Sequence, residues 1–200
     1  MTLKELFIKY QDYTDKERTH KYGTIYDKWI GWMNPKNILC LGCAGFGGGD
    51  LLSFAEYYPD AMIVGLDVDL KNINKQITNC SRIRLEQLNA YYVQSVAFIR
   101  DKYGDFDIII DDALHQPNNQ YKAFCLWKSL LKRGGVYIIE DVLVATQHKL
   151  RDKIERHKEW TFEFIDTKAT VNTEGDDSII VKCQRITNAH NQHLRIHSHD

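Results

Sequence analysis

Hydrophobic positions along the chain alternate between short apolar runs and stretches with helical spacing. The apolar runs predict buried strands, of which the first five cover 37–41, 62–66, 83–86, 106–110 and 136–139. The stretches between and after them predict helices over 50–58, 70–79, 91–102, 119–132 and 146–157. Short strands that alternate with helices indicate right-handed βαβ units and a parallel sheet covered on both faces.

This alternation changes at both ends of the chain. Two further strand-like runs, 160–165 and 178–183, are joined by a polar loop rather than a helix, which predicts an antiparallel hairpin. Helical spacing predicts an N-terminal helix over 2–13, and segment 20–33 is expected to hold a loop and a short helix. The predicted fold is therefore α/β: a Rossmann-like, doubly wound, mostly parallel seven-stranded sheet with a C-terminal antiparallel hairpin.

Three parts of the chain are expected. Residues 1–34 form an N-terminal helical cover segment, 35–187 form the main domain, and 188–200 form a polar, histidine-rich tail without apolar periodicity, which is expected to be disordered. Four aromatic residues of the first part either cover a site as a lid or pack a helix onto the sheet. They are Tyr22, Tyr26, Trp29 and Trp32.

Composition excludes several classes of protein. The chain has 200 residues with 26 Lys plus Arg and 27 Asp plus Glu, so its net charge of −1 does not suit a protein that mainly wraps nucleic acid. The five cysteines are an odd number without a regular framework, so buried reduced thiols are expected rather than disulfides. We find neither a signal-peptide pattern nor an apolar stretch long enough for a bilayer, and we expect a cytoplasmic location.

A glycine-rich segment joins the first strand to its helix. Such a loop lets the backbone turn and approach a ligand at the helix N-terminus. Asp67 ends the next strand, where a carboxylate can accept both hydroxyl hydrogens of a ribose. This combination indicates an adenine nucleoside, either a dinucleotide or S-adenosylmethionine; the alternative is a packing loop with a capping aspartate. The hairpin is similar to that of class I methyltransferase sheets, and an amide at Gln87 or Asn89 could meet the adenine, so S-adenosylmethionine is favoured.

Acidic residues follow the fourth and fifth strands. Because ligands bind outside the carboxyl ends of parallel strands, Asp111, Asp112, His115, Glu140 and Asp141 are expected at the same rim as the glycine loop. Crowded carboxylates repel one another unless a cation lies among them, and oxygen ligands favour Mg²⁺. His115 is a candidate general base. The alternative is that one aspartate caps the next helix and the histidine is solvated.

Segment 106–142 resembles the metal-dependent sugar O-methyltransferases of macrolide biosynthesis. In that family strand four ends in Asp-Asp-Gly-Ser-His and strand five in Glu-Asp, and this chain has Asp111-Asp112-Ala113-Leu114-His115 and Glu140-Asp141. The resemblance implies metal binding by Asp112 and Asp141 and catalysis by His115. The family also has a Lys-Tyr-Gly-Thr stretch followed by Tyr-Glu, whose acid completes the metal site. Here Lys21-Tyr22-Gly23-Thr24 precedes Tyr26-Asp27, so Asp27 is the expected third ligand.

The resemblance implies an O-methyltransferase that uses S-adenosylmethionine, assisted by Mg²⁺, and acts on a hydroxyl of a small, sugar-like or polyol-like molecule. The expected cofactor-binding residues are Gly42, Cys43, Ala44, Gly45, Gly47, Asp67, Val68, Asn89 and Asp111. Two alternatives stay open: a metal-independent methyltransferase for a nitrogen or a nucleic acid, and a cofactor-binding subunit without catalysis. The expected partner is a small hydroxylated substrate rather than nucleic acid or a membrane, and a homo-oligomer is left open.

Overall fold

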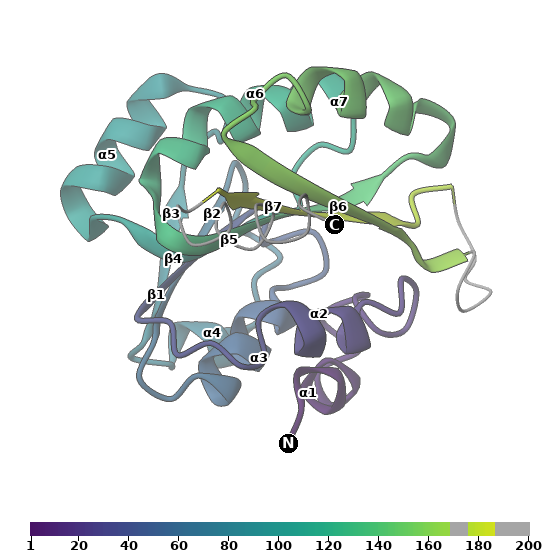
Figure 1. Ribbon diagram of the computed structural model, residues 1–200. Coiled ribbons are helices and arrows are strands. Elements are labelled where there is room, and N and C mark those ends of the chain that lie inside the picture. The colour runs from purple at the N-terminus through teal and green to yellow at the C-terminus, as the bar shows by residue number, and fades with distance from the viewer. Residues whose placement is uncertain (169–175, 187–200) are drawn as a thin grey trace, which may run out of the picture.

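The fold is a seven-stranded sheet with helices on both faces, seen in a computed structural model that describes residues 1–168 and 176–186 (Figure 1). The strands are β1 Asn37–Leu41, β2 Met62–Asp67, β3 Ile83–Gln87, β4 Phe106–Asp111, β5 Leu131–Val142, β6 Trp160–Asp166 and β7 Ile179–Arg185. The helices are α1 Leu3–Lys9, α2 Gly23–Trp29, α3 Gly49–Tyr57, α4 Lys75–Thr78, α5 Val93–Tyr103, α6 Pro117–Trp127 and α7 Gln147–Ile154, with 3₁₀ turns η1 Lys128–Leu130 and η2 Val144–Thr146.

The strand order is β3-β2-β1-β4-β5-β7-β6. Strands β1 to β5 are parallel, whereas β7 pairs antiparallel with both β5 and β6. The predicted fold, including its C-terminal hairpin, is thereby confirmed. The order in which strands are added to the sheet reverses between β1 and β4, which are adjacent and parallel. Open α/β sheets bind ligands at such a switch point.

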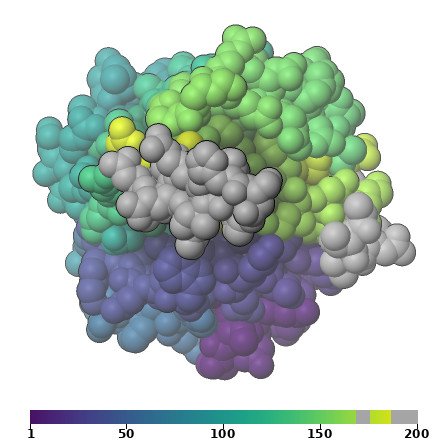
Figure 2. All heavy atoms as spheres, in the orientation of Figure 1, coloured from purple at the N-terminus to yellow at the C-terminus, as the bar shows by residue number. Residues whose placement is uncertain are grey.

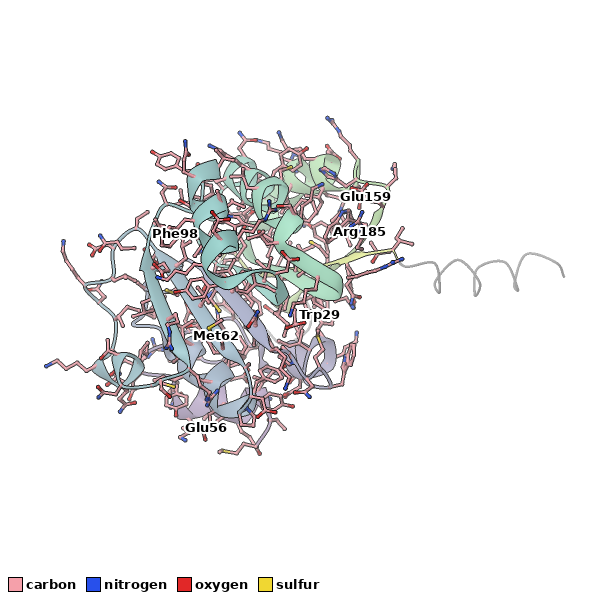
Figure 3. The ribbon with its side chains drawn as sticks, turned by 90° about the vertical axis from the view of Figure 1, so that its left-hand side faces the viewer. Trp29, Glu56, Met62, Phe98, Glu159 and Arg185 are labelled. Atoms are coloured by element: carbon pink, nitrogen blue, oxygen red, sulfur yellow. The ribbon has the colours of Figure 1, made fainter. Side chains whose placement is uncertain are left out.

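Two apolar layers hold the sheet between its helices. Alternating strand residues such as Ile38 and Ile108 pack against α1, α2 and α3 on one face, and Leu39 and Ile109 pack against α5 and α6 on the other. Figure 3 shows the same division, with Glu56 of α3 and Phe98 of α5 on opposite sides of the strands. In Figure 2 the N-terminal residues form the lower part of the visible surface, below the green helices.

Several predicted boundaries differ from the structure: the N-terminal helix ends at Lys9 rather than at 13, β5 continues to Val142 rather than ending at 139, and two larger differences follow. The polar segment 70–79 forms only the single turn of α4, because Asn74 caps a helix that ends at Thr78. Strand β5 begins at Leu131 rather than at 136, so the helix predicted over 119–132 ends five residues earlier, at Trp127, and is followed by the 3₁₀ turn η1. Neither difference alters the carboxyl ends of the strands. The histidine-rich tail 188–200 lies outside the described residues.

The N-terminal segment packs into the core of the sheet. Phe7 contacts both Tyr26 and Phe54 edge to face, with ring centroids 5.3 and 5.8 Å apart. Tyr22, Tyr26 and Trp29 are buried in the same apolar layer as β1, whereas Trp32 is 71% exposed. The helix-packing alternative therefore applies to the first three aromatic residues. The five cysteines are all free thiols, as expected, and three of them are buried.

No helix among residues 1–168 and 176–186 is long and apolar enough to cross a membrane.

Candidate active site

A cavity of about 440 Å³ opens at the carboxyl ends of the parallel strands. Its volume lies in the range typical of small-molecule sites. It is lined by Tyr13, Thr14, Asp15, Lys16, Gly42, Cys43, Gly45, Phe46, Gly48, Asp50, Leu66, Asp67, Val68, Leu88, Asn89, Ala90, Tyr91, Asp112, Ala113, Leu114, His115 and Asp141. The cavity thus brings together the glycine loop, the end of β2 and the acidic ends of β4 and β5.

The glycine loop is held in place by its neighbours. Gly42 has φ = +80°, and a Cβ at this position would lie 2.2 Å from the Asp112 carbonyl oxygen, so no other residue fits without moving the end of β4. The Ala44 N–H donates a hydrogen bond to Asp67 Oδ2 over 2.9 Å. Asp67 therefore stabilises the loop, as the packing alternative required, and it also lines the cavity.

The segment after β3 forms another wall of the cavity. Asn89 lines the cavity, and its Oδ1 accepts a hydrogen bond from Tyr91 N–H over 2.9 Å, which fixes a turn. The Tyr91 hydroxyl in turn accepts a hydrogen bond from Leu114 N–H over 2.8 Å. Gln87, the other amide considered, donates to the Val68 carbonyl instead and does not line the cavity.

The acidic end of the cavity contains a compact group of three side chains. His115 Nε2 lies 3.3 Å from Asp112 Oδ1 and 3.7 Å from Asp141 Oδ2. One nitrogen or oxygen atom from each residue lies within 4.8 Å of the others, close enough to share one ion. These are the residues for which the sequence predicted a metal and a base, and the parallel strands bring them together.

Local geometry explains where Asp141 points. The pairing of β5 with β7 shifts register between Ile139 and Val142, so Glu140 and Asp141 lie at a bulge. Asp141 has φ = +53°, a left-handed conformation that a non-glycine residue adopts at some cost. The bulge separates the two acids: Glu140 packs against the N-terminal segment, and Asp141 reaches the cavity.

The crowding of carboxylates is visible in the direction of the pKa shifts. Burial raises the pKa of Asp141 to about 7, and the charge of Asp112 adds to this effect. Burial would lower the pKa of His115, but its hydrogen bond with Asp112 and the charge of Asp141 outweigh burial and raise it to about 9. These carboxylates and this histidine fit a divalent cation, since a cation among them would compensate the repulsion that the pKa values report.

Lys16 is a member of the site that the sequence analysis missed. Its side chain is only 2% exposed, and its Nζ lies 3.0 Å from Asp112 Oδ2 and also contacts Glu140 Oε2. Burial opposes the ammonium charge, but Asp112 and Glu140 together hold the pKa of Lys16 well above its usual value. Its loop has no apolar periodicity, so nothing in the sequence marked it.

Asp15 and His20, in the same loop, were also missed as site residues. His20 Nε2 lies 3.3 Å from Asp15 Oδ2, and its Nδ1 lies 3.5 Å from Asp141 Oδ1. The Tyr22 hydroxyl donates a hydrogen bond to the same Asp141 oxygen over 2.8 Å. One ligand atom from each of Asp15, His20 and Asp141 also falls within 4.8 Å. The N-terminal segment therefore contacts Oδ1 of Asp141, whereas His115 lies beside Oδ2.

Backbone contacts attach this loop to the glycine loop. The Gly49 N–H donates a hydrogen bond to the Tyr13 carbonyl over 2.7 Å. A Cβ on Gly49 would lie 2.9 Å from the carbonyl oxygens of Tyr10 and Tyr13, so the close approach requires glycine here. Residues 13–16 consequently form a wall of the cavity.

Two predicted site residues lie elsewhere. The prediction for Asp27 is wrong: its carboxylate accepts hydrogen bonds from Leu3 N–H at 2.7 Å and Lys4 N–H at 3.4 Å, at the N-terminus of α1. The side chain of Asp111 does not line the cavity, because strand alternation points it to the opposite face of the sheet, where the Tyr137 hydroxyl donates to it over 3.4 Å. Ala44 and Gly47 belong to the glycine loop without lining the cavity.

Solved structures share this architecture. The MycE methyltransferase from the mycinamycin biosynthetic pathway, in complex with Mg and SAH, matches with a TM-score of 0.71 and 22% identity over 94% of this chain and 55% of that chain. The structure titled cmcI-D160 Mg-SAM matches with a TM-score of 0.60 and 19% identity over 82% of this chain and 70% of that chain. The chain has the class I methyltransferase fold.

Two sequence relatives of this chain are named as sugar O-methyltransferases. The 8-demethyl-8-(2-methoxy-alpha-L-rhamnosyl)-tetracenomycin-C 3'-O-methyltransferase of Streptomyces olivaceus is 32% identical over 133 residues, 63% of this chain and 33% of that protein. Mycinamicin VI 2''-O-methyltransferase of Micromonospora griseorubida is 31% identical over 147 residues, 64% of this chain and 36% of that protein. No family model matches the chain.

These relatives confirm the resemblance to the sugar O-methyltransferase group that the sequence indicated. The chain spans about a third of the length of the curated relatives it matches. The similarity therefore applies to the part of those proteins that corresponds to this α/β fold.

Proposed function

We propose that this chain is an S-adenosylmethionine-dependent O-methyltransferase that acts on a hydroxyl group of a small, sugar-like or polyol-like molecule. One observation carries the proposal: the cavity that contains the glycine loop and Asp67 also contains His115 beside Asp112 and Asp141. A nucleoside site and a base with two carboxylates therefore share one space. Support comes from MycE, solved with Mg and SAH, and from relatives that are named sugar O-methyltransferases.

The cofactor side of the cavity would hold the nucleoside. The Asp67 carboxylate can accept the ribose hydroxyls, since each of its oxygens uses only one lone pair on a backbone N–H, of Ala44 and of Asp69. Asn89 lines the adenine side of the same space. The residues proposed to contact the cofactor are Gly42, Cys43, Gly45, Asp67, Val68 and Asn89.

The acidic side of the cavity would hold Mg²⁺ on Asp112 and Asp141. Bound there, Mg²⁺ supplies a lower pKa for a coordinated hydroxyl and compensates the carboxylate charges that keep His115 protonated. His115 would accept the hydroxyl proton at Nδ1, because its Nε2 faces Asp112 Oδ1 at 3.3 Å and is the nitrogen that donates to that carboxylate. Asp112 orients the imidazole, and the walls of the cavity align the acceptor oxygen with the methyl group.

A metal-independent methyltransferase is the second candidate function, with a nitrogen or a nucleic acid as acceptor. One observation favours it: the Lys16 ammonium already compensates part of the carboxylate charge without any metal. Under this alternative, chelation of divalent metal leaves turnover unchanged. A subunit that binds the cofactor without catalysis differs from both candidates in showing no transfer to any acceptor.

The experiment that tests the proposal is a screen of hydroxylated metabolites with labelled S-adenosylmethionine, with Mg²⁺ or with EDTA. We expect methyl transfer that depends on Mg²⁺ and falls about 100-fold or more in His115→Gln, because a general base contributes roughly 10²–10⁴-fold. His148→Gln, at an exposed position of α7, is the matched control and should stay within about twofold. Failure of the protein to bind S-adenosylmethionine in calorimetry would contradict both methyltransferase candidates.

A further inference from the structure

Lys16 brings a fixed positive charge to the ends of two strands. Its ammonium group contacts Asp112, directly after β4, and Glu140, near the end of β5. All three side chains meet where the N-terminal loop crosses the carboxyl edge of the sheet. A buried ammonium between two carboxylates occupies the kind of position that a metal ion would otherwise fill.

The contacts divide the carboxylate oxygens between two tasks. Glu140 Oε2 accepts from Lys16, and Glu140 Oε1 accepts from the Tyr26 hydroxyl at 2.5 Å, so both oxygens are engaged away from His115. Asp112 Oδ2 faces Lys16, whereas Asp112 Oδ1 faces His115. Asp141 divides in the same way: its Oδ1 accepts from Tyr22, and its Oδ2 faces His115.

We propose that Lys16 is a positioning residue that keeps Glu140 out of the cation site and leaves Asp112 and Asp141 to hold a divalent ion beside His115. This inference rests on the proposed function. Lys16 and Glu140 together add no net charge to the site, so the ion meets two carboxylates, each with one oxygen toward His115, rather than three. Since the number of charged ligands sets the affinity of a hard cation, Lys16 keeps the site weak enough for substrate oxygens to share the ion.

The test is a charge cycle read out by Mn²⁺ binding, a probe with the same preference for oxygen ligands. Calorimetric titrations without substrate compare the unmodified protein with Lys16→Met, Glu140→Gln and the double variant. We expect Lys16→Met to bind Mn²⁺ at least about tenfold more tightly, because Glu140 is released to the ion. Glu140→Gln should bind at least about tenfold more weakly, because the ammonium is then uncompensated. The double variant should return to within about threefold of the unmodified protein.

Controls make the cycle independent of folding and of the methyltransferase activity. Lys36→Met makes the same chemical change at an exposed position before β1, at the opposite edge of the sheet, and should leave Mn²⁺ binding unchanged. Should Lys16→Met fail to fold, Glu140→Gln and the double variant still ask the same question, because they must differ by about tenfold in affinity.

The outcomes separate the inference from the function on which it rests. Equal or weaker Mn²⁺ binding in Lys16→Met, or a double variant as tight as Lys16→Met, overturns the role of Lys16. Absence of Mn²⁺ binding in all the variants overturns it as well. Binding by Lys16→Met but not by the unmodified protein would overturn the ion on Asp112 and Asp141, and with it the magnesium in the proposed function. Binding of S-adenosylmethionine, measured separately, tests the methyltransferase itself.

Discussion

Asp67 contacts both the protein and the space proposed for the cofactor. One oxygen accepts the Ala44 N–H, the other accepts the Asp69 N–H, and the carboxylate lines the cavity. Its neighbour Asp69 has an exposed carboxylate that pairs with Lys71. Asp67 therefore lines the cavity and Asp69 does not, so variants of the two residues can be compared.

We predict that Asp67→Ala weakens S-adenosylmethionine binding by at least about tenfold, because it removes an ionised acceptor for the ribose and the acceptor that fixes the glycine loop. Calorimetric titration measures the effect. Asp69→Ala, the matched control, should change the dissociation constant by less than about twofold. Equal weakening in the two variants would mean that a general loss of negative charge, rather than a contact of Asp67, is responsible.

The same residue scale shows what a sequence pattern can predict for single side chains. Asp112 and His115 follow β4 and Asp141 lies at the end of β5, and the carboxyl ends of parallel strands meet at one edge whatever the loops do. Asp27 was placed only by the resemblance of segment 21–27 to a family motif, and its carboxylate instead caps a helix. A side chain outside the strands can reach several places, and the sequence does not distinguish among them.

At the scale of elements, α2 supports α1 through that aspartate. Two backbone N–H groups at the start of α1 donate to Asp27, and they would otherwise have no partner within the helix. Negative charge at a helix N-terminus is favourable as well. The contact therefore ties together two helices that pack on the same face of the sheet.

We predict that Asp27→Ala lowers the free energy of unfolding by about 1 kcal/mol and leaves Mn²⁺ binding unchanged. Asp141→Asn should remove most Mn²⁺ binding. It should change the free energy of unfolding less, because the amide keeps a carbonyl acceptor for Tyr22. Denaturant unfolding and calorimetry report the two quantities separately. A loss of Mn²⁺ affinity in Asp27→Ala would restore Asp27 to the metal site.

The attachment of the N-terminal loop to α3 is the other contact between elements that the site requires. We predict that Gly49→Ala lowers the free energy of unfolding by about 1–3 kcal/mol, because the new Cβ would lie 2.9 Å from backbone atoms of Tyr10 and Tyr13. Gly45→Ala is the control for stability, since no atom lies within 4 Å of its added Cβ. It should change the stability by less than about 0.5 kcal/mol.

For the molecule as a whole, the buried acids make stability depend on pH. The pKa is raised by burial to about 6 for Asp50, to about 7 for Asp111 and to about 7 for Asp141. A group whose pKa is raised in the folded state binds more protons there than in the unfolded chain. Its stabilising contribution is complete below its ordinary pKa and is lost as pH rises through the raised value.

We predict that the protein in EDTA loses stability as pH rises from about 4 to 7, and further up to about 9 as His115 deprotonates. The lowered pKa of Asp112 acts at the acidic end and does not oppose this trend. Melting temperature against pH measures it. Mg²⁺ should raise the melting temperature most at pH 8. At 100 times its dissociation constant, it adds about 2.7 kcal/mol to the free energy of unfolding.

A variant at a buried acid that does not line the cavity separates the two contributions to that profile. Asp111 lies on the opposite face of the strand ends, and its Oδ1 has no hydrogen-bond partner within the described part of the chain. Asp111→Asn should therefore flatten the fall in stability between pH 4 and 7 without changing the stabilisation by Mg²⁺. An unchanged profile in this variant would show that Asp111 does not titrate in that range.

The sequence by itself determined the strands, their mostly parallel direction, the C-terminal hairpin, the glycine loop and the acids at the ends of β4 and β5. Each of these follows from local pattern, because hydrophobic spacing defines a strand and strand direction defines the edge at which its last residues lie. Only the tertiary structure decided that Lys16 lies between Asp112 and Glu140 and that His20 lies beside Asp141. Those positions depend on contacts between residues about 100 or more apart along the chain, for which a loop without periodicity gives no signal.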